Sequence, residues 1–148
     1  MLESTAQKLG NVHPGARFEH IEYQDFLRSA EVTTPILAMS GKLGVGQAIL
    51  NAIRKTQTVC NYNTNLGIVM LLAPFAAIDE SHRIEDGIDE VMFNLSNFDA
   101  LLVYDAIRTA NPRGLGLKES QDVSVDPTGT LNEVMALAAD RDAIAWEY

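Results

Sequence analysis

The segment from Leu66 to Ile78 limits the possible folds more than any other part of the chain. It is an apolar run of 13 residues that contains Pro74. A membrane-spanning helix needs about 20 apolar residues, so this run is too short to cross a bilayer. A helix that is apolar all round is buried, so we expect the segment to form the central helix of the fold. Pro74 predicts a kink or a break within it.

Amphipathic helices are predicted before this segment. From Tyr23 onward, apolar residues recur at spacings of three and four toward Pro35 or Met39, which indicates a helix. Glycines then interrupt the pattern before a second helix that carries one apolar stripe. The stripe consists of Val45, Ala48, Ile49, Ala52 and Ile53, and the residues that face away are Gln47, Asn51, Arg54 and Lys55.

Further helices are predicted after the apolar segment. The polar stretch from His82 to Glu90 is expected to be a connection, and the stretch from Asn111 to Gly129 is expected to be a long irregular loop. Thr130 and Glu133 form a capping-box pattern, which opens a last helix that runs to Tyr148. The apolar positions of the two intervening helices are Val91, Met92, Leu95 and Phe98 for the first, and Ala100, Leu101, Tyr104, Ala106 and Ile107 for the second.

The fold class follows from these periodicities. No segment shows the alternation of a half-buried strand over a convincing length, so the sequence predicts an all-α fold. We expect residues 1–148 to form a single multi-helix domain. The last helix has no stop signal, and only a stub of helix from Ser4 to Lys8 precedes Gly10. We therefore expect the domain to be truncated at both ends and to belong to a larger helical fold.

Composition restricts the partners and the compartment. The chain has 148 residues and a formal net charge of −9, and no cluster of Lys and Arg interrupts the acidic excess. This charge argues against nucleic-acid binding, which needs a concentrated basic face. The single cysteine, Cys60, excludes an intramolecular disulfide, fits a reducing compartment and is expected to be buried. No secretory segment follows Met1, so we expect a cytoplasmic protein without a membrane partner.

Three polar segments are candidates for a site. They are Lys8–Glu19, the amide-rich Asn61–Asn65 at the start of the apolar helix, and Ala106–Asp122. Amides at a helix N-terminus can bind a ligand, although Asn and Thr also occur there as ordinary caps. In the third segment Arg108 and Arg113 lie on either side of Asn111-Pro112, and Gly114-Leu115-Gly116 follows; glycines next to guanidinium groups suit phosphate oxygens.

Metal ligands are limited to oxygen donors. The three histidines are scattered without the spacing of a zinc site, and the common nucleotide-binding and hydrolase motifs are absent. Asp122 and Asp126 flank a short loop and could offer carboxylates to a cation. Asp140 and Asp142 are expected on a helix about 200° apart, so at most one of them could face an ion, and an ion pair with Arg141 is the simpler interpretation.

Taken in order, the motifs resemble those of the triphosphoribosyl-dephospho-CoA synthase family, in its divergent branch. The chain resembles the N-terminal half or so of a full-length member. The resemblance implies an all-helical enzyme that transfers the triphosphoribosyl group of ATP to dephospho-CoA and releases adenine, with Mg²⁺ accompanying the ATP. The matching segments are Leu2-Glu3, Lys8-x-Gly10-Asn11-Val12-His13-Pro14, Asp25-Phe26-x-x-Ser29, Gly44-Val45-Gly46, Asn63-Thr64-Asn65-Leu66-Gly67, Ala106-Ile107-Arg108, Gly114-Leu115-Gly116, Asp122-Val123 and Ala139-Asp140-Arg141-Asp142.

The resemblance implies a role for each polar segment. Asp25 or Asp122 would act as a base or hold Mg²⁺, with Asp122 the candidate metal ligand, and Asn63 and Asn65 would orient the ribose or the base. Asn11 belongs to the same substrate-binding set. The cations and hydrogen-bond donors for the phosphates would be Lys8, His13, Arg17, Arg108 and Arg113.

The chain departs from the better-known members at several positions. Leu9 replaces a proline, Asn65 and Leu66 replace a His-Lys pair, and Gln47 stands where Glu is common. The lost His and Lys remove a titratable group and a cation from the expected phosphate site. The Asn-Thr-Asn-Leu-Gly version belongs to the divergent branch, so an acceptor other than dephospho-CoA stays open. Two alternatives also stay open: an inactive or truncated helical module that binds a nucleotide or a partner, and hydrolysis of an N-glycosidic bond. The oligomeric state is open too, a homo-oligomer included.

Overall fold

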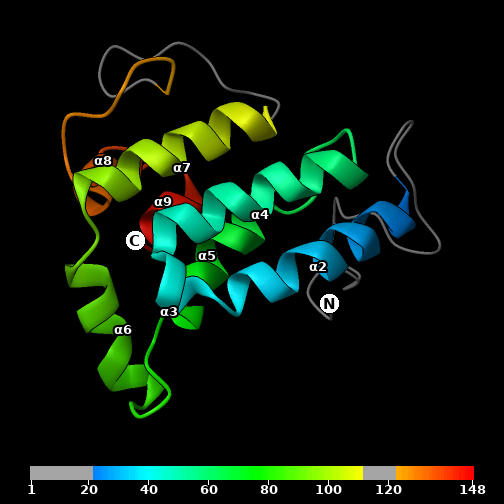
Figure 1. Cartoon of the computed structure of the whole chain (residues 1–148). Coiled ribbons are helices and arrows are strands. Elements are labelled where there is room, and N and C mark those ends of the chain that lie inside the picture. The colour runs from blue at the N-terminus through cyan, green and yellow to red at the C-terminus, as the bar shows by residue number, and fades with distance from the viewer. Residues whose placement is uncertain (1–21, 112–122) are drawn as a thin grey trace.

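The computed structural model describes residues 22–111 and 123–148. Within these ranges the chain is helical and contains no strand, which confirms the all-α prediction (Figure 1). None of the helices in the described part is long and apolar enough to span a membrane. The helices are α2 (Tyr23–Leu37), α3 (Ser40–Leu43), α4 (Val45–Val59), α5 (Leu66–Ala76), α6 (Ile84–Phe93), α7 (Asn97–Ala110), α8 (Leu131–Ala136) and α9 (Ala143–Trp146).

Helix α4 lies in the middle of the bundle, packed against α2, α5 and α7. Helices α4 and α7 run in the same direction, and the backbone N–H of Gly46 donates to Asp99 Oδ1 at 3.0 Å near the start of both (Figure 1). Helix α2 runs in the opposite direction, so its first turn meets the end of α4. There the Cys60 thiol donates to the carbonyl oxygen of Asp25 at 3.2 Å.

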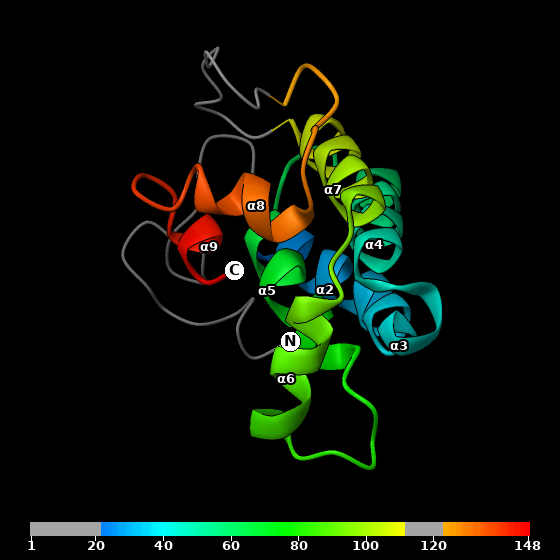
Figure 2. The ribbon, with the colours of Figure 1, turned by 90° about the vertical axis from the view of Figure 1, so that its left-hand side faces the viewer.

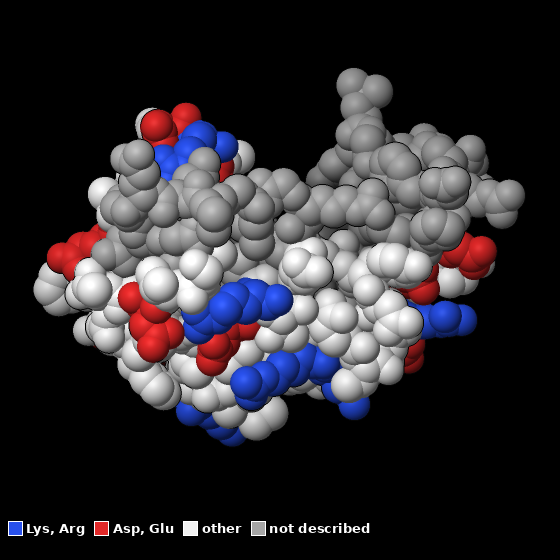
Figure 3. Space-filling view, turned by 90° about the horizontal axis from the view of Figure 1, so that it is seen from above, with Lys and Arg blue, Asp and Glu red and all other residues white. Residues whose placement is uncertain are grey.

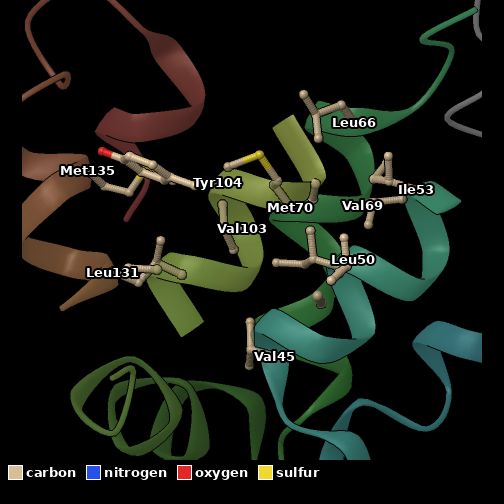
Figure 4. Close-up of a cluster of buried hydrophobic side chains, with 14 of the residues drawn as sticks. Val45, Leu50, Ile53, Leu66, Val69, Met70, Val103, Tyr104, Leu131 and Met135 are labelled. Carbon is tan, nitrogen blue, oxygen red and sulfur yellow. The ribbon is translucent and has the colours of Figure 1, made fainter. Parts of the chain in front are cut away.

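The core is built from apolar side chains of α4, α5, α7 and α8 (Figure 4). The predicted stripe of α4 is confirmed, because all five of its members are at most 5 % exposed. Leu50, which the stripe omits, is also buried. Cys60 is buried as expected. The side chains labelled in Figure 4 are Val45, Leu50, Ile53, Leu66, Val69, Met70, Val103, Tyr104, Leu131 and Met135.

Helix α5, the predicted central helix, is surrounded on most of its circumference. It contacts α2, α3, α4, α6, α7 and α9, and Figure 2 shows it between α2 and the α8–α9 pair. One face is open, because Leu72 is 46 % exposed and Phe75 is 49 % exposed. The expectation of burial on all sides is therefore wrong for that face. Pro74 does not break the helix, which continues to Ala76.

The prediction that residues His82 to Glu90 form a connection is wrong, since α6 already begins at Ile84. Acidic side chains in its first turn favour a helix N-terminus, and this signal was available in the sequence. The helix ends at Phe93, and Ser96 opens α7 with a capping box to Asp99. Phe98 therefore belongs to α7 and is 63 % exposed.

The last predicted helix is divided into two. The Thr130–Glu133 capping box is confirmed at the start of α8, but α8 ends at Ala136. Asp142 is the N-cap of α9, where its carboxylate accepts from the N–H groups of Ile144 and Ala145. Asp140 therefore precedes the helix rather than lying on it, and it pairs with Arg141 at 2.9 Å. The helical angle expected between Asp140 and Asp142 does not apply.

Candidate functional site

One end of the bundle gathers the helix termini that adjoin the predicted polar segments. The C-terminal ends of α4 and α7 and the N-terminal end of α2 lie on the same side (Figure 1). The N-terminal end of α5 joins them, because the hydroxyl of Thr56 near the end of α4 donates to Asn65 Oδ1 at 3.2 Å. Residues from three separate parts of the sequence are thus brought to one end of the fold.

The amide-rich segment lies at the N-terminus of α5. Asn63 Oδ1 accepts from the N–H of Leu66 at 3.0 Å, so this side chain performs the ordinary capping role. Thr64 and Asn65 differ, because they are only 6 % and 5 % exposed. Thr64 Oγ1 and Asn65 Nδ2 have no hydrogen-bond partner in the structure as described. Each such buried polar group costs about 1–3 kcal/mol, so their burial calls for a ligand or another compensation.

Asp25 lies in the first turn of α2, beside this segment. Its Oδ2 accepts from the N–H of Glu22 at 3.0 Å in a capping box, and its Oδ1 lies 3.8 Å from Arg28 Nη1. The carboxylate is partly buried, with 19 % of the side chain exposed. Burial and then the charge of Asp25 raise the pKa of the Cys60 thiol. Asp25 and Cys60, the residue that directly precedes the amide segment, therefore share one environment.

Arg108 lies in the last turn of α7, and its guanidinium is engaged within the protein. It donates to Asp105 Oδ1 at 2.6 Å and to the carbonyl oxygen of Val123 at 2.7 Å, and it lies 3.5 Å from Asp126 Oδ1. The hydrogen bond to Asp105 raises the pKa of Arg108. These contacts tie the segment that begins at Val123 to α7. Among the described residues, Arg108 forms no hydrogen bond or ion pair with the amide segment.

The remaining predicted site residues fall outside the described ranges. Of the ten candidates, the structure places Asp25, Asn63, Asn65 and Arg108. It brings Asp25 and the segment Cys60–Asn65 together, and it places Arg108 at the same end of the bundle. The candidates outside the described residues are Lys8, Asn11, His13, Arg17, Arg113 and Asp122.

Two residues of this region were not predicted as functional. Thr64 was part of a recognised motif, but only its burial distinguishes it from a cap. Thr56 belongs to the buried face of α4, and in the sequence a single threonine among aliphatic residues indicates a functional role only weakly. The Thr56 hydroxyl donates to Asn65 Oδ1. The other polar atom of that amide, Nδ2, has no partner among the described residues.

Charges on the described surface are mixed. On the face shown in Figure 3, acidic and basic side chains alternate, and the visible described residues form no continuous basic patch. Within residues 22–111 and 123–148, no group of three or more His, Cys, Asp or Glu side chains is arranged to hold a metal ion. The site as described therefore offers amides, hydroxyls and one nearby carboxylate rather than a metal cluster.

The comparisons with known proteins assign the family. A family model described as "CitG: ATP:dephospho-CoA triphosphoribosyl transferase" matches residues 1–148. No curated protein and no solved structure gives a significant match. Since the family model spans the whole sequence, including the Asn63–Gly67 motif and Asp25, the chain belongs to the ATP:dephospho-CoA triphosphoribosyl transferase family.

Proposed function

We propose that this chain carries the nucleotide-binding part of a transferase that moves the triphosphoribosyl group of ATP to dephospho-CoA or a related acceptor and releases adenine. The observation that carries the proposal is the pair of unpartnered buried atoms, Thr64 Oγ1 and Asn65 Nδ2, at the N-terminus of α5. Family membership supplies the reaction class.

The two side chains fit recognition of a sugar or base. Asn65 Nδ2 is a donor, while Thr64 Oγ1 can donate or accept, so together they match the hydroxyl and ring-nitrogen pattern of a nucleoside. The first turn of α5 adds backbone N–H groups that favour negative charge. A ligand that bonds both atoms regains the free energy that the unoccupied protein loses by burying them.

The chemistry asks for a base near the sugar. The bond between the anomeric carbon and adenine breaks while a bond forms from that carbon to the acceptor oxygen. The acceptor hydroxyl loses its proton, and adenine departs with the bonding electron pair and takes up a proton. The transition state has oxocarbenium character, as in glycoside transfer, so a carboxylate beside the sugar is favourable. We propose that Asp25 accepts this proton through Oδ1, since Oδ2 already accepts from the N–H of Glu22.

Mg²⁺ is proposed to arrive with the triphosphate. This ion keeps several waters and takes phosphate oxygens with one or two carboxylates, so a dedicated protein cluster is not required. Asp122, the candidate metal ligand, lies outside the described residues.

Adenine release tests the proposal. The protein is incubated with Mg·ATP and dephospho-CoA, and free adenine and the nucleotide product are separated by chromatography. Asn65→Asp replaces the buried Nδ2 donor by an acceptor while keeping the size, so we expect kcat/KM to fall at least about tenfold. Asn61→Asp is the matched control, because Asn61 is exposed in the same segment and its substitution introduces the same charge. Its activity should equal that of the unsubstituted protein.

The products separate the proposal from its alternatives. Adenine released without an acceptor, together with free ribose triphosphate, would indicate hydrolysis. ATP binding by calorimetry that Asn65→Asp weakens, without adenine release from any acceptor, would identify a nucleotide-binding module that is not an enzyme. Equal kcat/KM for Asn65→Asp and Asn61→Asp, with both variants folded, would exclude the amide segment from the site.

A further inference from the structure

A concave site lies at the opposite end of α4 from the amide segment. It is a pocket of about 510 Å³ between α3, the first residues of α4, and α6. The rise of 1.5 Å per residue along a 15-residue helix separates it from the amide segment by roughly 20 Å. Its volume lies in the range of pockets that hold small organic ligands. The family motif Gly44-Val45-Gly46 contributes two of its lining residues, Gly44 and Val45.

One buried polar group that lines this pocket lacks a partner. Ser40 lines the pocket, is 0 % exposed, and its hydroxyl forms no hydrogen bond with any described residue. A buried hydroxyl without a partner costs about 1–3 kcal/mol. A serine at the start of a short helix could have been exposed to water at no such cost, so its burial beside a pocket points to a ligand that supplies the missing bond.

The lining is acidic. Asp79, Glu90 and Asp99 all line the pocket, His82 is the one imidazole among the lining residues, and no Lys or Arg is among them. Both carboxylate oxygens of Asp99 already accept hydrogen bonds within the protein, Oδ1 from the N–H of Gly46 and Oδ2 from the N–H of Ser96. Asp79 accepts from the N–H of Ser81 at 2.9 Å, and the hydrogen bonds from Ser81 lower its pKa, which keeps it ionised at neutral pH. The Glu90 carboxylate forms no hydrogen bond or ion pair with the described residues, so it is the acid most available to a ligand.

The charge and the arrangement select the kind of ligand. An acidic wall repels phosphate, so this pocket does not suit the triphosphate of ATP. A bare divalent cation is also unsuited, because the described residues hold no group of three metal ligands. The lining also contains Val45, Ala77, Val91 and Leu95, which offer apolar surface to methylene groups.

We propose that this pocket binds an aliphatic diamine or polyamine. One ammonium group donates to the Ser40 hydroxyl, a second is held by Glu90 near Asp79, and the methylene chain lies on the apolar lining residues. This site is separate from the proposed nucleotide site, and its occupancy does not depend on the transfer reaction.

Calorimetry with putrescine (1,4-diaminobutane) on the full chain at low salt tests the site. We expect saturable binding with one ligand per chain. 1,4-Butanediol has the same carbon chain without charge and should show no binding. Glu90→Gln should weaken putrescine binding about tenfold or more, as expected for loss of a charged hydrogen bond. Asp89→Asn, one position away on α6, exposed and outside the lining, should change the dissociation constant less than twofold.

Ser40→Ala distinguishes a ligand contact from a structural role. Since the hydroxyl is buried without a partner, its removal should leave the Tm unchanged or raise it, while putrescine binding weakens severalfold. Equal weakening by Glu90→Gln and Asp89→Asn would mean general attraction to an acidic protein and would overturn the proposal. Binding of butanediol as tight as that of putrescine, tighter binding of inorganic triphosphate, or no saturation at millimolar putrescine would overturn it too.

Discussion

The hydroxyl of Tyr148 donates a 2.8 Å hydrogen bond to the main-chain carbonyl oxygen of Met70. In an uninterrupted helix that carbonyl would accept from the N–H of the residue four positions later. That residue is Pro74, which has no N–H. Tyr148 therefore supplies the donor that the proline removes, and it fastens the C-terminal segment to α5. This pairing explains how α5 continues past Pro74 to Ala76.

Tyr148→Phe should lower the free energy of unfolding by about 1–2 kcal/mol, because it leaves the Met70 carbonyl without a donor. In a Pro74→Ala background the new N–H can serve that carbonyl, so the same substitution should cost less than about 0.5 kcal/mol. Urea unfolding of the four proteins in this cycle measures the difference. Tyr62→Phe is the control, because Tyr62 is 37 % exposed and should be neutral. A cost for Tyr148→Phe that is identical in both backgrounds would contradict the pairing.

Tyr148 also predicts a pH dependence. Burial raises its pKa in the folded protein, whereas the unfolded chain loses the phenolic proton near pH 10. Above that pH the unfolded state binds fewer protons than the folded state, so the free energy of unfolding falls as the pH rises. The slope should approach about 1.4 kcal/mol per pH unit from this group alone. Unfolding measured at pH 9, 10 and 11 should show this extra slope in the unsubstituted protein and not in Tyr148→Phe.

Gly46→Ala should destabilise the protein although alanine favours helices. A Cβ at position 46 would lie 2.7 Å from the Cα of Asp99 and 3.0 Å from its carbonyl oxygen. The α7 backbone cannot yield locally, so we expect a net loss of about 1–3 kcal/mol despite a propensity gain of about 1 kcal/mol. Gly67→Ala is the control, because its Cβ would meet the flexible end of Ile144 at 3.1 Å. Thermal unfolding of the two variants measures the shift in Tm that each substitution causes. An equal shift for Gly46→Ala and Gly67→Ala would contradict the close approach of α4 to α7.

Much of the fold could be predicted because the information was local. The stripe of α4, the capping box at Thr130 and the burial of Cys60 each follow from residues within a few positions of one another. The break before Asp142 was missed because the apolar register of the segment continues across it. Both halves bury apolar residues, so the pattern could not show that the backbone leaves the helix between them.

The candidate site was predictable in position and not in chemistry. The amides at the start of α5 were visible as a motif, and Asn63 performs the expected cap. Which atom of Asn65 is left without a partner depends on Thr56, which lies nine residues away on another helix. The engagement of Arg108 likewise depends on where the chain returns at Val123 and Asp126. Such pairings are tertiary and leave no trace in the spacing of residues.

Arg108→Ala should loosen the segment that begins at Val123. The substitution removes hydrogen bonds to Asp105 and Val123, and we expect a loss of about 1 kcal/mol, limited because the side chain is 34 % exposed. Limited proteolysis should cleave near residues 123–130 severalfold faster. Arg141→Ala is the control, because Arg141 pairs with the exposed Asp140 next to it and should change neither rate nor stability. Unchanged cleavage in Arg108→Ala would mean that other contacts hold this segment.

Cys60 should report on the environment of Asp25. The thiol is 5 % exposed and donates to the Asp25 carbonyl oxygen, and burial followed by the Asp25 charge raises its pKa. Since the thiolate is the reactive form, alkylation at pH 8 should be at least about tenfold slower in the folded than in the unfolded protein. As the single cysteine, it gives an unambiguous rate by mass spectrometry.

Asp25→Asn removes the charge that disfavours the Cys60 thiolate, so the pH profile of alkylation should move to lower pH while the folded content stays constant by circular dichroism. Asp89→Asn removes the same charge from an exposed position on α6 and should leave the profile where it is. Equal profiles for both variants would show that burial alone controls the thiol. A shift confined to Asp25→Asn would demonstrate that the Asp25 carboxylate acts on Cys60, the residue that directly precedes the amide segment.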